Sequence, residues 1–169
     1  MIKQKGQTLL EILLAFSVAI LVLGAVIGGV ITTLSNTQYT KNQNLARSYA
    51  QEGMDIVRGI RDSSWPKFSS YTTNTTYCIS QNSPTLTDPS PPPSNCGQNL
   101  GIFMREVKFE HASVECKVAP TCSGDCLKKS SKATVKVSWS DNKCPVGTPY
   151  CHKVELITCF SNIDEKPSP

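Results

Sequence analysis

The sequence predicts an α+β protein in which one long N-terminal α-helix packs on a small, disulfide-rich antiparallel β-sheet. Three observations support this fold class. The chain carries no charge from Ile12 to Ile31, its C-terminal part alternates apolar and polar residues, and it holds eight cysteines among 169 residues. An even number of cysteines in a small domain is typical of a disulfide framework formed in an oxidising compartment.

The first element is an apolar helix over residues 7–34 that is long enough to cross a membrane. The uncharged run matches the roughly 20 residues that span a bilayer core. Lys3 and Lys5 precede it without an acidic neighbour, which predicts an N-terminus in the cytoplasm and an exported remainder. Gly24 and Gly28 lie about one helical turn apart, a spacing that lets helices approach closely.

Glu11 stands near the leading end of this apolar run. A carboxylate in hydrocarbon costs roughly 2.5–3.5 kcal/mol on insertion scales, so we expect it to serve a partner. Three alternatives stay open at this point. The segment could be an ordinary secretory signal peptide, although it is long for one, or a plain signal anchor. The carboxylate could also simply lie at the membrane interface.

The helix is expected to continue as an amphipathic segment over residues 35–64. No proline occurs before Pro66, and Trp65-Pro66 should end the helix. An apolar stripe recurs at approximately helical spacing, and charged residues fill much of the remaining surface. The stripe consists of Leu45, Tyr49, Met54, Ile56, Val57 and Ile60. This half should cover the apolar face of a soluble domain.

Residues 65–101 are rich in serine, threonine and proline and are expected to form a long loop. Residues 102–169 are expected to form the head, an antiparallel sheet with disulfide-linked loops. Period-two alternation predicts three half-buried strands. Their expected ranges are Ile102 to Glu110, Ala133 to Ser140 and His152 to Asn162. In the first of them, Arg105 interrupts the apolar face.

The cysteines predict disulfides rather than a metal site, because their spacings contain no paired CxxC motifs. Eight cysteines allow many connectivities, so the sequence does not fix the pairing. The expected pairs are Cys78–Cys96, which flank the proline-rich loop, Cys122–Cys126, Cys144–Cys151 and Cys116–Cys159. The last pair would tie the sheet to its final strand.

The sequence contains no catalytic motif. It has no P-loop and no GxSxG motif, and no motif around His111 or His152 identifies either as a general base. We therefore expect that the protein is not an enzyme and binds no cofactor. A local cluster of lysines, typical of a solvated face, leaves nucleic-acid binding as a minor alternative. The cluster consists of Lys128, Lys129, Lys132 and Lys136.

The stretch Lys5-Gly6-Gln7-Thr8-Leu9-Leu10-Glu11, followed by the apolar run, resembles the type IV pilin family, which includes minor pilins and pseudopilins. The resemblance implies that residues 1–6 are a leader, that a prepilin peptidase cuts after Gly6, and that Gln7 becomes a methylated amino terminus. Glu11 would then be the fifth residue of the mature chain. The family usually has phenylalanine where this chain has Gln7. The segment Ala46 to Trp65 is similar to pilin-like proteins of small-genome bacterial lineages.

The resemblance further implies a structural subunit, major or minor, of a type IV pilus-like filament. In such filaments the apolar helices bundle, and Glu11 would pair with a neighbouring amino terminus to set the assembly register. Implied partners are other pilins, the prepilin peptidase, an assembly ATPase and an inner-membrane platform protein. The precursor would lie in the bacterial inner membrane and the assembled form at the cell surface. Two alternatives are a secretion pseudopilin and an adhesive or DNA-binding minor pilin at a filament tip.

Overall fold

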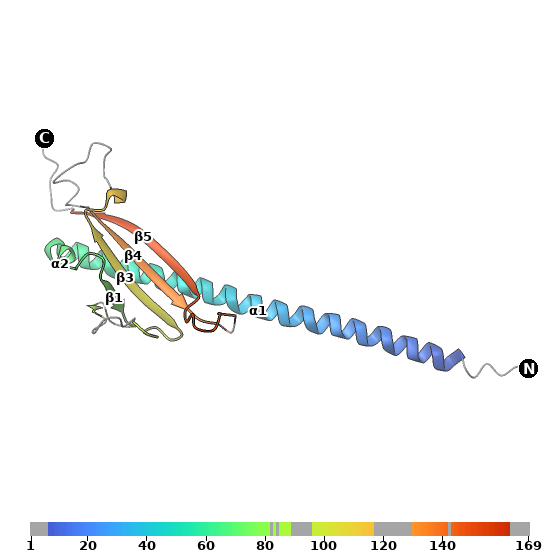
Figure 1. Ribbon diagram of the computed structural model, residues 1–169. Coiled ribbons are helices and arrows are strands. Elements are labelled where there is room, and N and C mark those ends of the chain that lie inside the picture. Colours follow the sequence, from blue (N-terminus) through green and yellow to red (C-terminus); the bar gives the residue numbers. More distant parts are fainter. Residues whose placement is uncertain are drawn as a thin grey trace, which may run out of the picture. The chain divides into compact units, whose positions relative to one another are not determined.

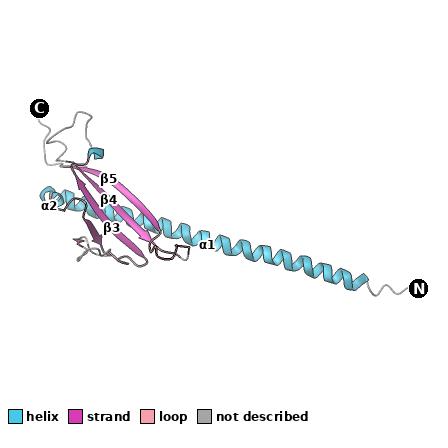
Figure 2. Cartoon of the chain, viewed as in Figure 1, coloured by secondary structure: helices cyan, strands magenta, loops and turns pink. Residues whose placement is uncertain are grey.

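The structure, a computed structural model, describes residues 7–81, 83, 85–88, 96–116, 130–141 and 143–162. The helices are α1 (Gln7–Ser63), α2 (Trp65–Ser69) and a 3-10 turn, η1 (Val114–Cys116). The strands are β1 (Thr76–Ile79), β2 (Leu86–Thr87), β3 (Phe103–His111), β4 (Ser130–Trp139) and β5 (His152–Ser161). Figure 1 labels most of them, and Figure 2 distinguishes helices from strands. The chain divides into two units, Met1–Asn42 and Gln43–Pro169, so that the boundary falls within α1.

The second unit contains a five-stranded antiparallel sheet in the order β2-β1-β3-β4-β5. Strands β3, β4 and β5 form a meander in which Val107 lies opposite Val135 and Val135 opposite Leu156. β4 begins at Ser130, three residues before the expected start at Ala133. No apolar alternation marks these three residues, yet Ser130, Ser131 and Lys132 are all buried.

The segment 65–101, expected to be a loop, contains regular structure. Ser64 caps α2, its side chain accepting a hydrogen bond from the Lys67 backbone N–H, and Pro66 stands in the first turn of that helix, where a missing N–H costs nothing. β1 is an interior strand between β2 and β3. Its Tyr77, Cys78 and Ile79 are buried, although only a short apolar run marked them in the sequence.

The hydrophobic core lies between the sheet and the part of α1 that follows Gln43. The helix contributes Ala46, Ala50, Met54, Val57 and Ile60, all buried. From the sheet come Val107, Phe109, Val135, Val137 and Trp139. Phe68 of α2 closes one end, with its ring 5.4 Å from those of both Phe109 and Phe160. The expected packing of the amphipathic half of the helix on an antiparallel sheet is therefore present.

Gly53 marks the closest approach of this helix to the sheet. A Cβ atom at this position would lie 3.0 Å from Val135 Cγ1 and 3.2 Å from Arg105 Cδ. Real Cβ contacts are seldom that short, so the absence of a side chain allows the helix backbone to sit this close. At Gly59, six residues later on the same helix, a Cβ atom would have nothing within 4 Å.

Arg105 is fully buried inside this core. Its guanidinium donates hydrogen bonds to the carbonyl oxygens of Ile79 at 3.2 Å, Ser80 at 3.2 Å and Tyr49 at 3.1 Å. Its Nη1 also lies 3.2 Å from a carboxylate oxygen of Glu52, whose side chain is half exposed. The residue that interrupts the apolar pattern of β3 thus connects α1 to the end of β1.

Three disulfides cross-link the second unit, Cys78–Cys96, Cys116–Cys159 and Cys144–Cys151. They coincide with three of the four expected pairs, and the fourth, Cys122–Cys126, lies outside the described residues. Cys116–Cys159 joins η1 to β5, and Cys144–Cys151 closes the connection between β4 and β5.

Candidate functional site

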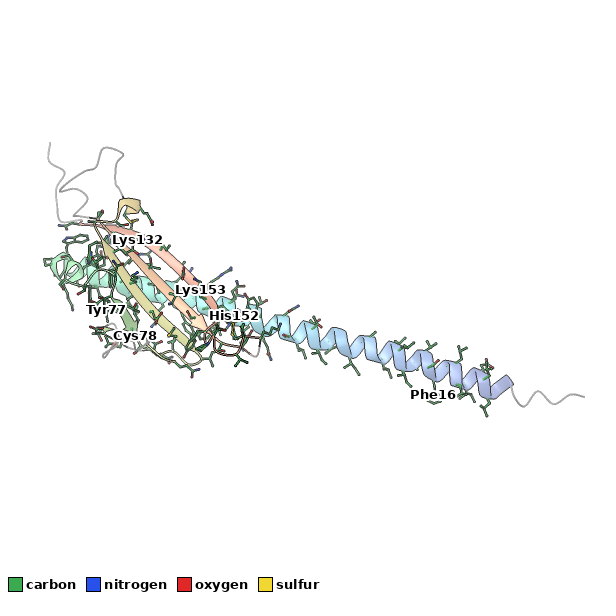
Figure 3. The ribbon with its side chains drawn as sticks, in the orientation of Figure 1. Phe16, Tyr77, Cys78, Lys132, His152 and Lys153 are labelled. Carbon is green, nitrogen blue, oxygen red and sulfur yellow. A yellow bond between two sulfur atoms is a disulfide. The ribbon has the colours of Figure 1, made fainter. Side chains whose placement is uncertain are left out.

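The helix surface from Leu9 to Leu34 is apolar and uncovered. Its large apolar side chains are all more than half exposed, for example Leu9 at 64%, Phe16 at 66% and Leu21 at 73%. Figure 3 shows Phe16 projecting from the helix. Soluble domains rarely expose a continuous apolar surface of this extent without a binding partner or a membrane. By length and composition, α1 is the one helix among the described residues that could cross a membrane.

Three hydroxyl groups of this segment, those of Ser17, Thr32 and Thr33, are satisfied within the helix itself. Ser17 donates its hydroxyl to the Leu14 carbonyl at 2.8 Å. Thr32 and Thr33 donate theirs to the carbonyls of Gly28 and Gly29, at 3.0 and 2.9 Å. Such bonds to the preceding turn let hydroxyl side chains enter an apolar environment without an unpaired donor. These three hydroxyls therefore need no hydrogen-bond acceptor outside the helix.

Glu11 differs from every neighbour on this surface. No other charged residue occurs between Gln7 and Thr40, and its side chain is exposed. Among the described residues, none forms an ion pair or hydrogen bond with its carboxylate. The apolar part of α1 thus carries one charge, and a partner for that charge would have to come from outside this segment. Gly6 lies outside the described residues, and Gln7 is described only as the first residue of α1.

Gly24 and Gly28, predicted to favour helix packing, lie on the open surface of α1. A Cβ at either position would meet nothing within 4 Å. The helix therefore has a shallow notch where a second helix backbone could approach closely. Within this chain no described residue fills it.

The outer face of the sheet carries a ladder of opposite charges. Lys136 lies opposite Glu106 on β3 and Glu155 on β5, and its Nζ is 2.6 Å from a Glu106 carboxylate oxygen. Lys132 contacts Glu110 at 2.8 Å and Glu115 at 2.9 Å. The pKa of the Lys132 ammonium is raised above its ordinary value, chiefly by the hydrogen bond that it donates to Glu110 and next by the one that it donates to Glu115.

These ion pairs bear on the minor alternative of nucleic-acid binding. A basic patch binds phosphate through lysines whose charge is uncompensated, whereas Lys132 and Lys136 already contact glutamates. Lys128 and Lys129 lie outside the described residues. The alternative gains no support from the two lysines that are described.

His111 has structural partners at the end of β3. Its Nε2 lies 2.7 Å from the Tyr71 carbonyl oxygen and its Nδ1 2.6 Å from the Ser131 hydroxyl. Because a carbonyl can only accept, Nε2 carries a proton and donates it. The ring also stacks on Phe109, with an interplanar angle of 7°. His111 therefore fastens the end of β3 to the segment that follows α2.

Comparisons with known protein families, with characterised proteins and with solved structures found no match. The functional interpretation of this chain consequently depends on its own sequence pattern and geometry.

Proposed function

We propose that this chain is a structural subunit of a type IV pilus-like filament. In this proposal the apolar part of α1 anchors the precursor in the membrane and then packs against the same helix of other subunits. The disulfide-linked second unit forms the exposed head. The leader resemblance around Gly6, Gln7 and Glu11 and the uncovered apolar helix support it together.

The observation that carries the proposal is Glu11, the only charge on an apolar helix surface without partners in the described chain. A buried carboxylate left alone is strongly unfavourable, and an ammonium beside it offsets much of that cost. In a bundle of identical helices, the amino terminus of a neighbouring chain supplies such an ammonium. A subunit displaced along the bundle axis leaves the Glu11 carboxylate and the neighbouring ammonium unpaired. The ion pair therefore favours one axial register of the subunits.

The properties of the head suit a subunit exposed outside the cell. Three described disulfides restrict its unfolded state, and each typically contributes about 2–4 kcal/mol. Such bonds persist in oxidising surroundings. A surface filament requires one part of the subunit for assembly and another that withstands the extracellular environment. In this proposal the apolar helix serves the first role and the disulfide-linked head the second.

The test compares Glu11→Ala with Ser17→Ala in cells that assemble the filament. Both substitutions remove a polar group from the same helix, but Ser17 is satisfied within it. We expect Glu11→Ala to insert into the membrane and lose its leader normally while the yield of sheared surface filaments falls at least tenfold. That factor corresponds to about 1.4 kcal/mol of lost pairing.

Ser17→Ala should leave the filament yield unchanged. Wild-type filament yield from Glu11→Ala, at equal membrane levels, would overturn the pairing. Equal losses from both variants would show that the helix surface, and not the charge, controls assembly.

A further inference from the structure

The turn between β4 and β5 brings four residues of metal-binding types together. Asp141, Cys144, Cys151 and His152 each offer one ligand atom, and these atoms all lie within 4.8 Å of one another. Asp141 lies two residues after the end of β4 at Trp139, and His152, labelled in Figure 3, is the first residue of β5. The two cysteines form a disulfide with their Cα atoms 5.5 Å apart.

We propose that these four residues are a redox-gated zinc site. In the oxidised chain the Cys144–Cys151 disulfide closes the turn. In the reduced chain a Zn²⁺ ion held by Asp141, Cys144, Cys151 and His152 closes it instead. This inference is independent of the proposed filament function.

The ligand set fits zinc chemically and sterically. Two thiolates, an imidazole and a carboxylate are donors that Zn²⁺ accepts in a tetrahedral shell, with bonds of about 2.3 Å to sulfur and about 2.0–2.2 Å to nitrogen and oxygen. Tetrahedral geometry then places the ligand atoms about 3.3–3.8 Å from one another. The four ligand atoms lie within 4.8 Å of one another, so the shell forms once the disulfide opens, the two sulfurs move apart and the more distant ligand atoms draw closer.

The surrounding groups hold the ligands in place before any metal binds. The Asp141 carboxylate accepts the Lys143 backbone N–H on Oδ1 at 2.8 Å, while its Oδ2 faces His152 Nε2 at 3.0 Å. The Trp139 ring lies 5.4 Å from the imidazole of His152, its partner in the β4–β5 register. The Lys143 N–H and the Trp139 ring make outer contacts of the kind that orient the ligands of natural zinc sites, whereas the Asp141–His152 contact joins two ligands that the metal would bridge.

A contact to sulfur completes the arrangement. The Asp141 backbone N–H donates to Cys144 Sγ at 3.5 Å, a bond that would also favour a thiolate in the reduced form. The side chains of Asp141 and His152 are only 23% and 22% exposed. Among the described residues, Cys78–Cys96 and Cys116–Cys159 have no comparable group of metal-binding side chains around them.

The exchange balances as a dithiol reaction. A dithiol reductant transfers two electrons and two protons to the Cys144–Cys151 bond and is itself oxidised to a disulfide. The two cysteines become thiols, and Zn²⁺ then displaces their two protons to solution without changing its own oxidation state. Reoxidation with loss of the metal reverses the sequence.

The experiment uses the full chain in detergent micelles, reduced with a phosphine that is removed before Co²⁺ is added as a spectroscopic substitute for zinc. We expect one Co²⁺ per chain with the intense visible bands of tetrahedral cobalt and a near-ultraviolet thiolate charge-transfer band. Zn²⁺ should displace it. The oxidised chain should show neither band.

The variants locate the site. Cys144→Ser/Cys151→Ser should abolish the thiolate band, and His152→Gln and Asp141→Asn should weaken Co²⁺ binding at least tenfold. Cys78→Ser/Cys96→Ser is the matched control and should bind as wild type. His152→Gln and Asp141→Asn keep the disulfide, so circular dichroism of their oxidised forms verifies the fold. No tetrahedral signal in the reduced wild type, or a signal unchanged by the Cys144/Cys151 or His152 variants, would overturn the proposal.

Discussion

Arg105 connects the helix and the sheet of the head through hydrogen bonds. Its charge is surrounded by three backbone carbonyls, and its one carboxylate partner, Glu52, is half exposed. Because the carbonyls are directed at a fully buried guanidinium, they contribute more to its stabilisation than the exposed ion pair does.

Arg105→Met should destabilise the head by about 3 kcal/mol, because it leaves buried carbonyl groups without their donors. Glu52→Gln should cost less than about 1 kcal/mol, as removal of a surface ion pair does. Urea unfolding of the oxidised full chain in detergent, followed by tryptophan fluorescence, measures both. Equal losses of stability in the two variants would mean that the Glu52 ion pair, and not the carbonyl hydrogen bonds, accounts for most of the contribution of Arg105.

The role of Arg105 could not be predicted from the sequence. The sequence does not show which groups a charged residue on an apolar strand face will contact. The carbonyl acceptors of Arg105 are 25, 26 and 56 residues away along the chain. Asp141 and His152 were equally hidden, because the β4–β5 pairing alone brings them together. By contrast, the sequence alone indicated Glu11 as a candidate site residue, because it is the single charged residue in a long apolar segment.

At the scale of elements, small residues set the distance between α1 and the sheet. Ala46, Ala50 and Gly53 are buried on the helix face toward the sheet, and the virtual Cβ of Gly53 is already in contact with Val135 and Arg105. A larger side chain there must push the helix away or displace its neighbours.

Gly53→Val should therefore lower the stability of the head by about 1–3 kcal/mol through overpacking. Gly59→Val makes the same change of residue on the same helix, where nothing lies within 4 Å, and should be nearly neutral. Thermal unfolding of the two variants compares them directly. If Gly59→Val were as harmful as Gly53→Val, contact with the sheet would not explain the loss, and helix propensity would not explain it either, because valine is a better helix former than glycine.

The elements with strong periodicity were predictable and the others were not. β3 and β5 lie within one residue of their expected ranges, because alternation of apolar residues such as Val154 and Leu156 is unambiguous. The helix face was only partly anticipated. Leu45, placed on the apolar stripe, is 36% exposed, whereas Ala46 and Ala50 are fully buried. Alanine is too small and too common on both helix faces to mark a buried position in the sequence. β1 was missed because its pairing with β3 is long-range.

At the scale of the whole molecule, the proposed function requires a shortened chain. Mass spectrometry of the surface-exposed protein should find a mature chain that begins at Gln7, with its new amine methylated. Gly6→Ala should leave the leader attached and prevent surface assembly, because the peptidase would lose its cleavage site. Lys3→Ala is the matched leader control. A surface chain that retains Met1, or normal filaments from Gly6→Ala, would contradict the processing step.

The sequence separations of the described disulfides predict an order in which the head oxidises. Its cysteines are 43 residues apart, against 18 and 7 for the other two described bonds. Closing a short loop costs less chain entropy than closing a long one. In addition, Cys159 on β5 reaches η1 only after β3, β4 and β5 lie side by side. We therefore expect the two short-range bonds to form first and Cys116–Cys159 to form last, once the β3-β4-β5 meander is complete, so that this bond covalently fixes the finished sheet.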